Sequence, residues 1–116
     1  SDTVTVSTMA GQLNMAASRA DELDRVISEV LANVGKHAGP GAHAWILLEQ
    51  EGNELIISVR DDGVGVTQEQ LDAAAAAGRL GVKESVIGRV IDLGGTSTLT
   101  TSPGSGTEWE FRMPLE

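Results

Sequence analysis

The stretch VRDDGVGV, residues 59–66, decides how the middle of this 116-residue chain is organised. An Asp-Gly pair after an apolar run usually closes a tight hairpin, and a hairpin needs a second strand directly after the turn. The residues that follow, Thr67-Gln-Glu-Gln70, are polar, and a run of alanines comes next. We therefore interpret Asp61 as the end of a strand, after which two glycines let the backbone turn and approach a ligand closely.

A long amphipathic helix is expected before this stretch. Six apolar residues recur there at helical spacing: Leu23, Val26, Ile27, Val30, Leu31 and Val34. Ser18 and Asp21 resemble a capping box at the start, with Asp in place of the usual Glu or Gln, and Gly39-Pro-Gly41 ends any helix. The pattern predicts a helix over about residues 19–37.

Short β-rich runs predict five strands, at residues 3–7, 45–49, 55–60, 96–102 and 107–113. A second helix is predicted over about residues 83–93, stopped by Gly94-Gly95. Residues 67–77 carry no strong apolar stripe and are expected to form a loop.

These elements predict an α+β fold. Adjacent strands joined by short turns indicate a mixed, mostly antiparallel sheet, and the two helices are expected to cover one face of it in a two-layer sandwich. No internal repeat or boundary is visible, so residues 1–116 are expected to form a single domain.

The composition narrows the functional class. A formal net charge of −9 argues against nucleic acid or an anionic membrane surface as the main partner. Disulfides and thiolate metal sites are excluded because the chain has no cysteine. No run approaches the roughly 20 apolar residues of a membrane span, and no signal peptide is visible. A soluble domain from a reducing compartment is expected.

Glu29, Asn33, Lys36 and His37 form a polar stripe on the first helix. At about 100° per residue, these positions share one sector beside the apolar stripe rather than opposite it. A single polar residue there most often belongs to a solvated face, but Asn is a poor mid-helix residue and the set is more specific. An amide oxygen suits Mg²⁺, and the two cations could reach phosphates.

Two further features fit a nucleotide. Asp61, at a strand end, could accept a hydrogen bond from an exocyclic amine such as that of adenine. The cluster Gly78-Arg-Leu-Gly81 comes just before the second helix, where backbone N–H groups favour anionic phosphate. The Gly-x-x-Gly spacing is weak on its own, and Gly104-Ser-Gly-Thr107 alone is only a hairpin turn.

In this order and spacing, the motifs resemble the ATP-binding catalytic domain of bacterial sensor histidine kinases, in the Bergerat-fold superfamily shared with DNA gyrase, Hsp90 and MutL. The resemblance covers about residues 18–114. EVLANVGKHA (residues 29–38) resembles the family's N box, and DDGVG (residues 61–65) its G1 box. GRLGVKESVIGRVIDLGG resembles the lid end and G2 region, and SPGSGTEWEFRMP the closing strand. The pattern is most similar to kinases that partner NarL-type response regulators.

The resemblance implies a role for each matching residue. Asn33 would ligate Mg²⁺ that bridges the phosphates, and Glu29 would act as general base or orient the acceptor. Asp61 would accept from the adenine amino group, with Thr107 supporting the adenine end. The remaining ATP-binding positions would make room for the base and ribose or meet the phosphates: Gly63, Gly65, Lys36, His37 and Gly81.

Two departures from the family pattern stand out. The G2 region reads Gly-Arg-Leu-Gly rather than Gly-x-Gly-Leu, so which glycine meets phosphate stays open. The lid contains five consecutive alanines, Ala73–Ala77, and few phosphate ligands. No segment matches the helical dimerisation segment that carries the phosphoacceptor histidine. His37 lies in the N box and His43 is expected in the loop before a strand, so neither is a plausible acceptor, and His43 is expected to be solvated.

The implied function is transfer of the ATP γ-phosphate to a histidine on a separate dimerisation domain, with ATP and Mg²⁺ as cofactors and a NarL-type response regulator downstream. The domain is expected to be cytoplasmic, to be monomeric when isolated, and to contact neither nucleic acid nor a membrane directly. Two alternatives stay open: an anti-sigma-factor serine kinase, and a non-catalytic protein-binding domain of the same fold.

Overall fold

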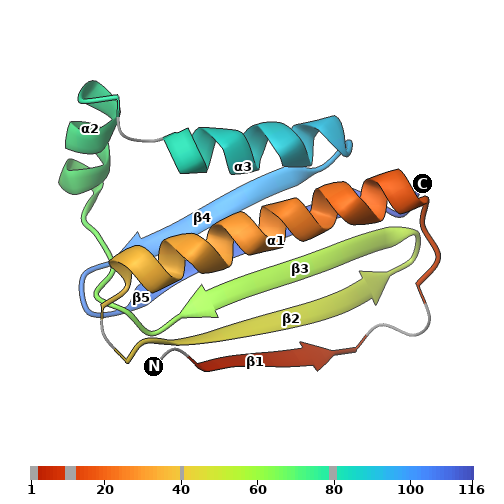
Figure 1. Ribbon diagram of the computed structural model, residues 1–116, viewed down its shortest axis with the longest axis horizontal. Helices are drawn as coiled ribbons and strands as arrows, with labels where there is room; N and C mark the ends of the chain where they lie inside the picture. Colours follow the sequence, from red (N-terminus) through yellow and green to blue (C-terminus); the bar gives the residue numbers. More distant parts are fainter. Residues whose placement is uncertain (1–2, 10–12, 40, 79–80) are drawn as a thin grey trace.

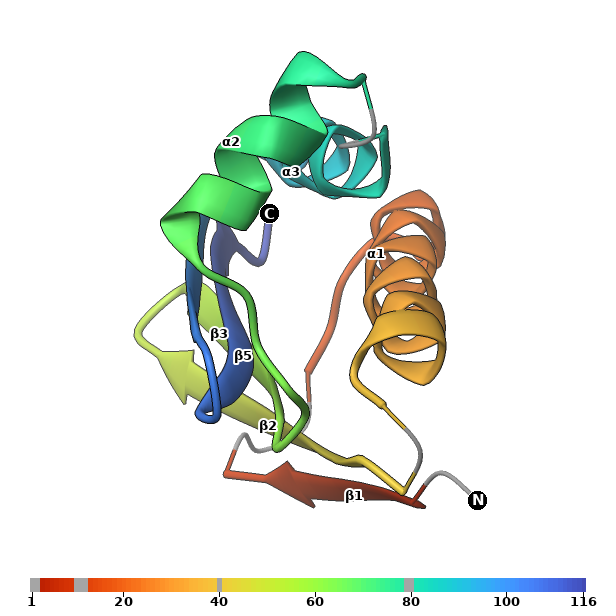
Figure 2. The ribbon, with the colours of Figure 1, turned by 90° about the vertical axis from the view of Figure 1, so that its left-hand side faces the viewer.

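The computed structural model describes residues 3–9, 13–39, 41–78 and 81–116, without the side chains of Thr3, Lys36, His37 and Val82. Helices α1 and α3 lie over one face of a sheet, and α2 stands at one end of the molecule (Figures 1 and 2). The elements in chain order are β1 (Thr3–Thr8), α1 (Ala17–His37), β2 (His43–Glu51), β3 (Glu54–Asp61), α2 (Gln68–Ala76), α3 (Gly81–Asp92), β4 (Thr96–Ser102) and β5 (Gly106–Pro114).

The sheet has five strands in the order β1-β2-β3-β5-β4. Strand β1 runs parallel to β2, whereas the other neighbouring pairs are antiparallel. The two predicted hairpins therefore form, and β3 pairs with β5 to join them into one sheet. The predicted α+β class and the mixed, mostly antiparallel sheet are confirmed.

The core lies between the sheet and the two long helices. Val59 pairs with Trp109 and Ile57 with Phe111 across β3 and β5, and these four side chains are buried. Because side chains alternate along a strand, this register puts one complete apolar face toward the helices. Val26 and Val30 of α1 and Val86 and Val90 of α3 complete that layer. None of the helices within the described ranges is both long and apolar enough to cross a membrane.

Helix α2 was not predicted. It begins with a capping box in which the Thr67 hydroxyl accepts from the Gln70 backbone N–H at 3.0 Å, while the Gln70 side chain accepts from the Thr67 N–H at 2.8 Å. Alanine is the strongest intrinsic helix former. No residue of α2 is buried, so the helix has no apolar stripe for a periodicity argument to detect.

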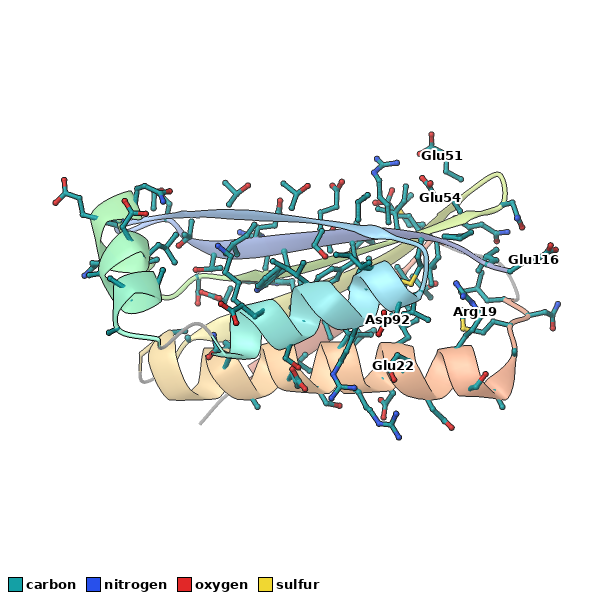
Figure 3. The ribbon with its side chains drawn as sticks, turned by 90° about the horizontal axis from the view of Figure 1, so that it is seen from above. Arg19, Glu22, Glu51, Glu54, Asp92 and Glu116 are labelled. Carbon is teal, nitrogen blue, oxygen red and sulfur yellow. The ribbon has the colours of Figure 1, made fainter. Side chains whose placement is uncertain are left out.

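The predicted capping box at Ser18 is wrong. Helix α1 begins at Ala17, and its N-cap residue, Ala16, makes no side-chain cap. Instead, one Arg19 nitrogen donates to two distant backbone carbonyls, Leu93 O at 2.8 Å and Pro114 O at 2.6 Å. Figure 3 shows Arg19 beside the last residues of the chain. Tertiary contacts therefore fix the start of this helix in place of a local cap.

Candidate functional site

A cavity of about 270 Å³ opens between the second half of α1, the start of α3 and the sheet. The loop after β3 and α2 close its other side, and in Figure 1 these elements gather at the end where β3 stops. Most of the lining is apolar, and the polar side chains on it are Asn33, Asp61, Lys83, Thr101 and Thr107.

Asp61 is the buried charged residue among the described residues, with 5 % of its surface exposed. Its Oδ1 accepts from the Gly63 backbone N–H at 2.8 Å, and no described residue donates to Oδ2. A carboxylate oxygen of a largely buried residue is costly to leave without a donor unless solvent or a ligand reaches it. Since Asp61 lines the cavity, a ligand N–H there would satisfy that oxygen.

The two glycines after Asp61 hold the loop against protein backbone. A Cβ on Gly63 would lie 2.5 Å from the Ala38 carbonyl oxygen, and a Cβ on Gly65 would overlap the Ser102 carbonyl. Gly65 also has a φ of 65°, which favours glycine. Gly65 lines the cavity, while Gly63 fits the loop onto the end of α1. The closest approaches of these glycines are thus to the chain itself, and their predicted contacts with base and ribose stay predictions.

Thr101, which the sequence did not single out, joins three segments around the cavity. Its hydroxyl oxygen accepts from the Val66 N–H at 3.1 Å, lies 3.1 Å from the Gly106 carbonyl oxygen and lies 2.8 Å from the Thr107 hydroxyl. The predicted Thr107 sits opposite Asp61 in the β3–β5 register. The two threonines therefore connect the glycine loop to the strand end that carries Asp61.

Asn33 is half-buried on α1 and lines the cavity. No described side chain or backbone group hydrogen-bonds to its amide, which leaves the amide oxygen open to a cation or a ligand donor. Lys36 and His37 end the same helix, but their side chains lie outside the described part of the chain.

Glu29 points to α3 and does not line the cavity. Its Oε1 lies 3.2 Å from Arg89 Nε and accepts from the Ser85 hydroxyl at 3.3 Å. Its Oε2 is buried without a partner among the described residues. Arg89 also bonds Glu22 at 2.8 Å. This hydrogen bond raises the pKa of Arg89 and lowers the pKa of Glu22 below its ordinary value.

The start of α3 contains one predicted residue, Gly81, whose contact with phosphate stays a prediction, and one that the sequence did not single out, Lys83. Gly81 is the first residue of the helix, and it is exposed and absent from the cavity lining. Lys83, two positions later, is half-buried and lines the cavity. A lysine in the first turn after a glycine cluster was the available sequence signal, since the chain has only one other lysine, Lys36.

Asp62 and His43 bond to each other where β3 ends and β2 begins. The Asp62 carboxylate accepts from the His43 backbone N–H at 2.7 Å, and the Asp62 N–H donates to the His43 carbonyl at 3.1 Å. The His43 ring lies 2.8 Å from the Thr5 hydroxyl and packs against Trp45 at 4.3 Å. His43 is thus the first residue of β2 and does not lie in a loop before it, and its ring is partly exposed and hydrogen-bonded.

Taken together, the cavity offers an apolar interior, a buried acceptor from the sheet, and an amide and an ammonium from the helices. These groups suit a ligand with a flat ring that carries an N–H donor and an anionic tail. Within the described ranges there is no group of three or more acidic, histidine or cysteine side chains that could hold a metal alone.

Comparison with known proteins agrees with this chemistry. Residues 18–116 match the family described as histidine kinase-, DNA gyrase B- and HSP90-like ATPases. The sensor histidine kinase LiaS of Bacillus subtilis is 28 % identical over 95 residues, or 82 % of this chain and 25 % of LiaS. The probable sensor histidine kinase TcrY of Mycobacterium tuberculosis is 27 % identical over 110 residues, or 84 % of this chain and 23 % of TcrY.

Solved structures show the same fold. The histidine kinase domain of the blue-light activated kinase from Erythrobacter litoralis EL346 superposes with a TM-score of 0.80 at 23 % identity, over 98 % of this chain and 52 % of that one. The mycobacterial sensor histidine kinase MprB gives a TM-score of 0.73 at 19 % identity, over 97 % of this chain and 81 % of that one.

The chain spans about a quarter of the length of these curated relatives. The family match covers nearly all of it, and its fold is that of the solved histidine kinase domains. The chain belongs to the histidine kinase-, DNA gyrase B- and HSP90-like ATPases, and the curated relatives that it resembles are sensor histidine kinases.

Proposed function

We propose that this domain binds Mg-ATP in the cavity and transfers the γ-phosphoryl group to a histidine on a separate dimerisation domain. The observation that carries the proposal is Asp61, a buried carboxylate that lines the cavity with one oxygen lacking a described donor. An adenine amino group supplies that donor. The apolar side chains around it, including Val59 and Trp109, suit the face of the base.

The residues around Asp61 support the adenine end. Thr107 is its cross-strand partner and is held by the Thr101 hydroxyl. Gly65 lines the same wall of the cavity. Gly63 contributes through its N–H, which holds Oδ1 of Asp61 and leaves the other oxygen for the base.

Asn33 fits a role as the protein ligand of Mg²⁺. Its amide lines the cavity and is free of described partners. Mg²⁺ usually keeps several waters and takes one or two protein oxygens together with substrate phosphates. A single amide oxygen is therefore sufficient, and the ion supplies charge neutralisation at the phosphates when it is bound.

Lys36 and His37 follow Asn33 at the end of α1, and we assign them to the phosphates on that position alone. Gly81 begins α3, where free backbone N–H groups favour anions. Phosphoryl transfer depends mainly on positioning and charge neutralisation, so the cations of α1 and the backbone N–H groups at the start of α3 would both serve the reaction.

Glu29 is the proposed catalytic carboxylate. In the transfer, the bond between the γ-phosphorus and the oxygen leading to ADP breaks, and a bond to an imidazole nitrogen of the acceptor forms. Glu29 would orient that imidazole or accept its proton. The proposal rests on the position of Glu29 one helical turn before Asn33, since in the structure Arg89 and Ser85 hold its Oε1 and its Oε2 is buried away from the cavity.

The partners follow from this reaction. We propose a dimerisation domain that carries the phosphoacceptor histidine and, after it, a NarL-type response regulator. We also propose a cytoplasmic site of action and a monomeric state for the isolated domain.

Mg-ATP titration by calorimetry tests the binding site. Asp61→Asn keeps the bond to Gly63 but presents an amide in place of the free acceptor, so we expect at least a hundredfold loss of affinity. Asn33→Asp places a second negative charge beside the phosphates and should also weaken binding. Asp92→Asn, at the exposed end of α3, is the charge-matched control. Unchanged affinity in both site variants would overturn the assignment.

Phosphate transfer separates the alternatives. After the domain is mixed with a separately expressed dimerisation domain and labelled ATP, an acid-labile phosphoryl product supports the histidine kinase. An acid-stable product on a protein serine favours the serine kinase. ATP binding without any transfer favours a non-catalytic protein-binding domain.

A further inference from the structure

Lys83 is a cation that the protein itself does not use. Its side chain is half-buried in the first turn of α3 and lines the cavity. Among the described residues it takes part in no ion pair and no hydrogen bond. A lysine ammonium is strongly hydrated, so placing it over a largely apolar cavity is explained best by an anionic partner there.

The other cation of α3 provides a direct contrast. Arg89 lies on the same helix and is bonded to two carboxylates of α1, Glu22 and Glu29. Glu29 is thereby engaged one helical turn before Asn33. The acidic side chain of α1 nearest the cavity is thus already bound to a cation, and Lys83 has no acidic partner on that helix.

The cavity holds opposite charges on different elements. Asp61 reaches it from β3 and Lys83 reaches it from α3, and these are the charged residues on its described lining. Asp61 is buried with a free acceptor oxygen, so it selects a ligand that carries N–H donors. The Lys83 ammonium instead favours a negatively charged part of the ligand, in a chain whose own formal net charge is −9.

We propose that Lys83 contacts the phosphate chain of the bound nucleotide, so that α3 as well as α1 supplies positive charge to the phosphates. This inference rests on the proposed function. It gives the phosphates a side chain from the G2 region, beyond the residues that the sequence assigns to them. Asn33 and Lys83 would then approach the phosphates from α1 and α3, on opposite sides of the cavity mouth.

A ligand series separates this inference from the proposed function. Adenosine, ADP and ATP are titrated with the wild-type domain, Lys83→Met and Lys83→Arg. We expect Lys83→Met to lose about tenfold to hundredfold in affinity for ADP and ATP, as for loss of a charge-assisted hydrogen bond, and to keep adenosine affinity within about twofold. Lys83→Arg should recover most of the lost affinity. Arg25→Met, an exposed cation on α1, controls for the change in net charge.

The outcomes are distinct. If the wild-type domain binds none of the three ligands, the proposed function fails. If it binds them and Lys83→Met weakens adenosine as much as ATP, or weakens neither, the role of Lys83 is overturned while ATP binding stands.

A measurement on the wild-type chain avoids any folding defect of the variants. The chain has two lysines, so reductive methylation followed by peptide mass spectrometry reports on each of them separately. We expect ATP to protect Lys83 from methylation and adenosine to leave it reactive. Equal reactivity with both ligands at saturation would also overturn the proposal.

Discussion

Helices α1 and α3 run antiparallel over the sheet, and their polar side chains are used differently at the two ends (Figures 1 and 3). At the end near Arg19 and Glu22, each of these charged groups bonds to the protein, through backbone carbonyls or Arg89. At the end where β3 stops, Asn33 and Lys83 have no described partner. We call these the closed end and the open end. Paired groups at the closed end hold the helices together, while the groups without a described partner at the open end are those that we propose to contact a ligand.

Replacing Gly65 should damage the open end most. In Gly65→Ala the new Cβ overlaps the Ser102 carbonyl, and the residue keeps a positive φ. We expect the free energy of unfolding to fall by about 2 to 4 kcal/mol, with loss of ATP binding. Urea unfolding and nucleotide titration measure the two effects.

Gly78→Ala is the matched control, because Gly78 has a φ of 69° but no atom of the described residues within 4 Å of its added Cβ. It should lower the free energy of unfolding only by the backbone strain of an alanine at positive φ, about 1 kcal/mol. Equal destabilisation in the two variants would show that the overlap with Ser102 is relieved without cost.

Removing the Thr101 hydroxyl should have an intermediate effect. Thr101→Val keeps the shape but leaves the Val66 N–H, the Gly106 carbonyl and the Thr107 hydroxyl without this partner. We expect a loss of about 1 to 3 kcal/mol. Thr98→Val, on an exposed position of the same strand, should change stability by less than about 0.5 kcal/mol. Chemical denaturation of both variants tests this, and a Thr101→Val stability equal to wild type would contradict the assigned role.

The contribution of the closed end to the free energy of unfolding should depend on pH, and this is the smallest of the expected effects. The bond to Arg89 lowers the pKa of Glu22, so the folded state binds a proton less readily than the unfolded state. The stabilisation is therefore complete above the ordinary pKa of 4.5 and is lost as the pH falls through the lowered value. Glu22→Gln should be less stable than wild type at pH 7, and this difference should shrink in acid.

The exposed acid Asp24 on the same helix supplies the comparison for Glu22. Asp24→Asn should differ little from wild type at pH 7. A stability difference between wild type and Glu22→Gln that stays constant from pH 7 to pH 3 would argue against the ion pair. Glu22 is partly exposed, so high salt should also reduce the effect.

Local patterns predicted the sheet well because the two strands of each hairpin are close together in the sequence. Alternation along Trp109, Phe111 and Met113 predicted the inner face of β5, and those side chains are buried. Helix α2 was not predicted because a helix without buried residues has no apolar stripe in its sequence. Its start at Thr67 and Gln70 did carry a capping signature, so the local signal existed and periodicity outweighed it.

The site was predicted only in part, because sequence patterns do not show contacts between residues that are far apart in the chain. Asn33, Asp61, Gly65 and Thr107 do line one cavity, and their roles toward a ligand stay predictions. The bond between Glu29 and Arg89 joins residues 60 positions apart on separate helices, so no spacing rule could reveal it. Lys83 did carry a sequence signal, as a lysine just after a glycine cluster, but only the structure shows that it lines the cavity without an acidic partner among the described residues.

The Arg19 contacts at the closed end have a consequence for the order of folding. Arg19 reaches Pro114, 95 residues away along the chain, and Leu93, 74 residues away. Contacts between residues so distant carry a large loop-closure cost and form slowly. On a ribosome, the start of α1 emerges before β5, so the contact between Arg19 and the Pro114 carbonyl can form only after β5 has emerged. The start of α1 is thus held in place by β5, a strand that is synthesised well after it.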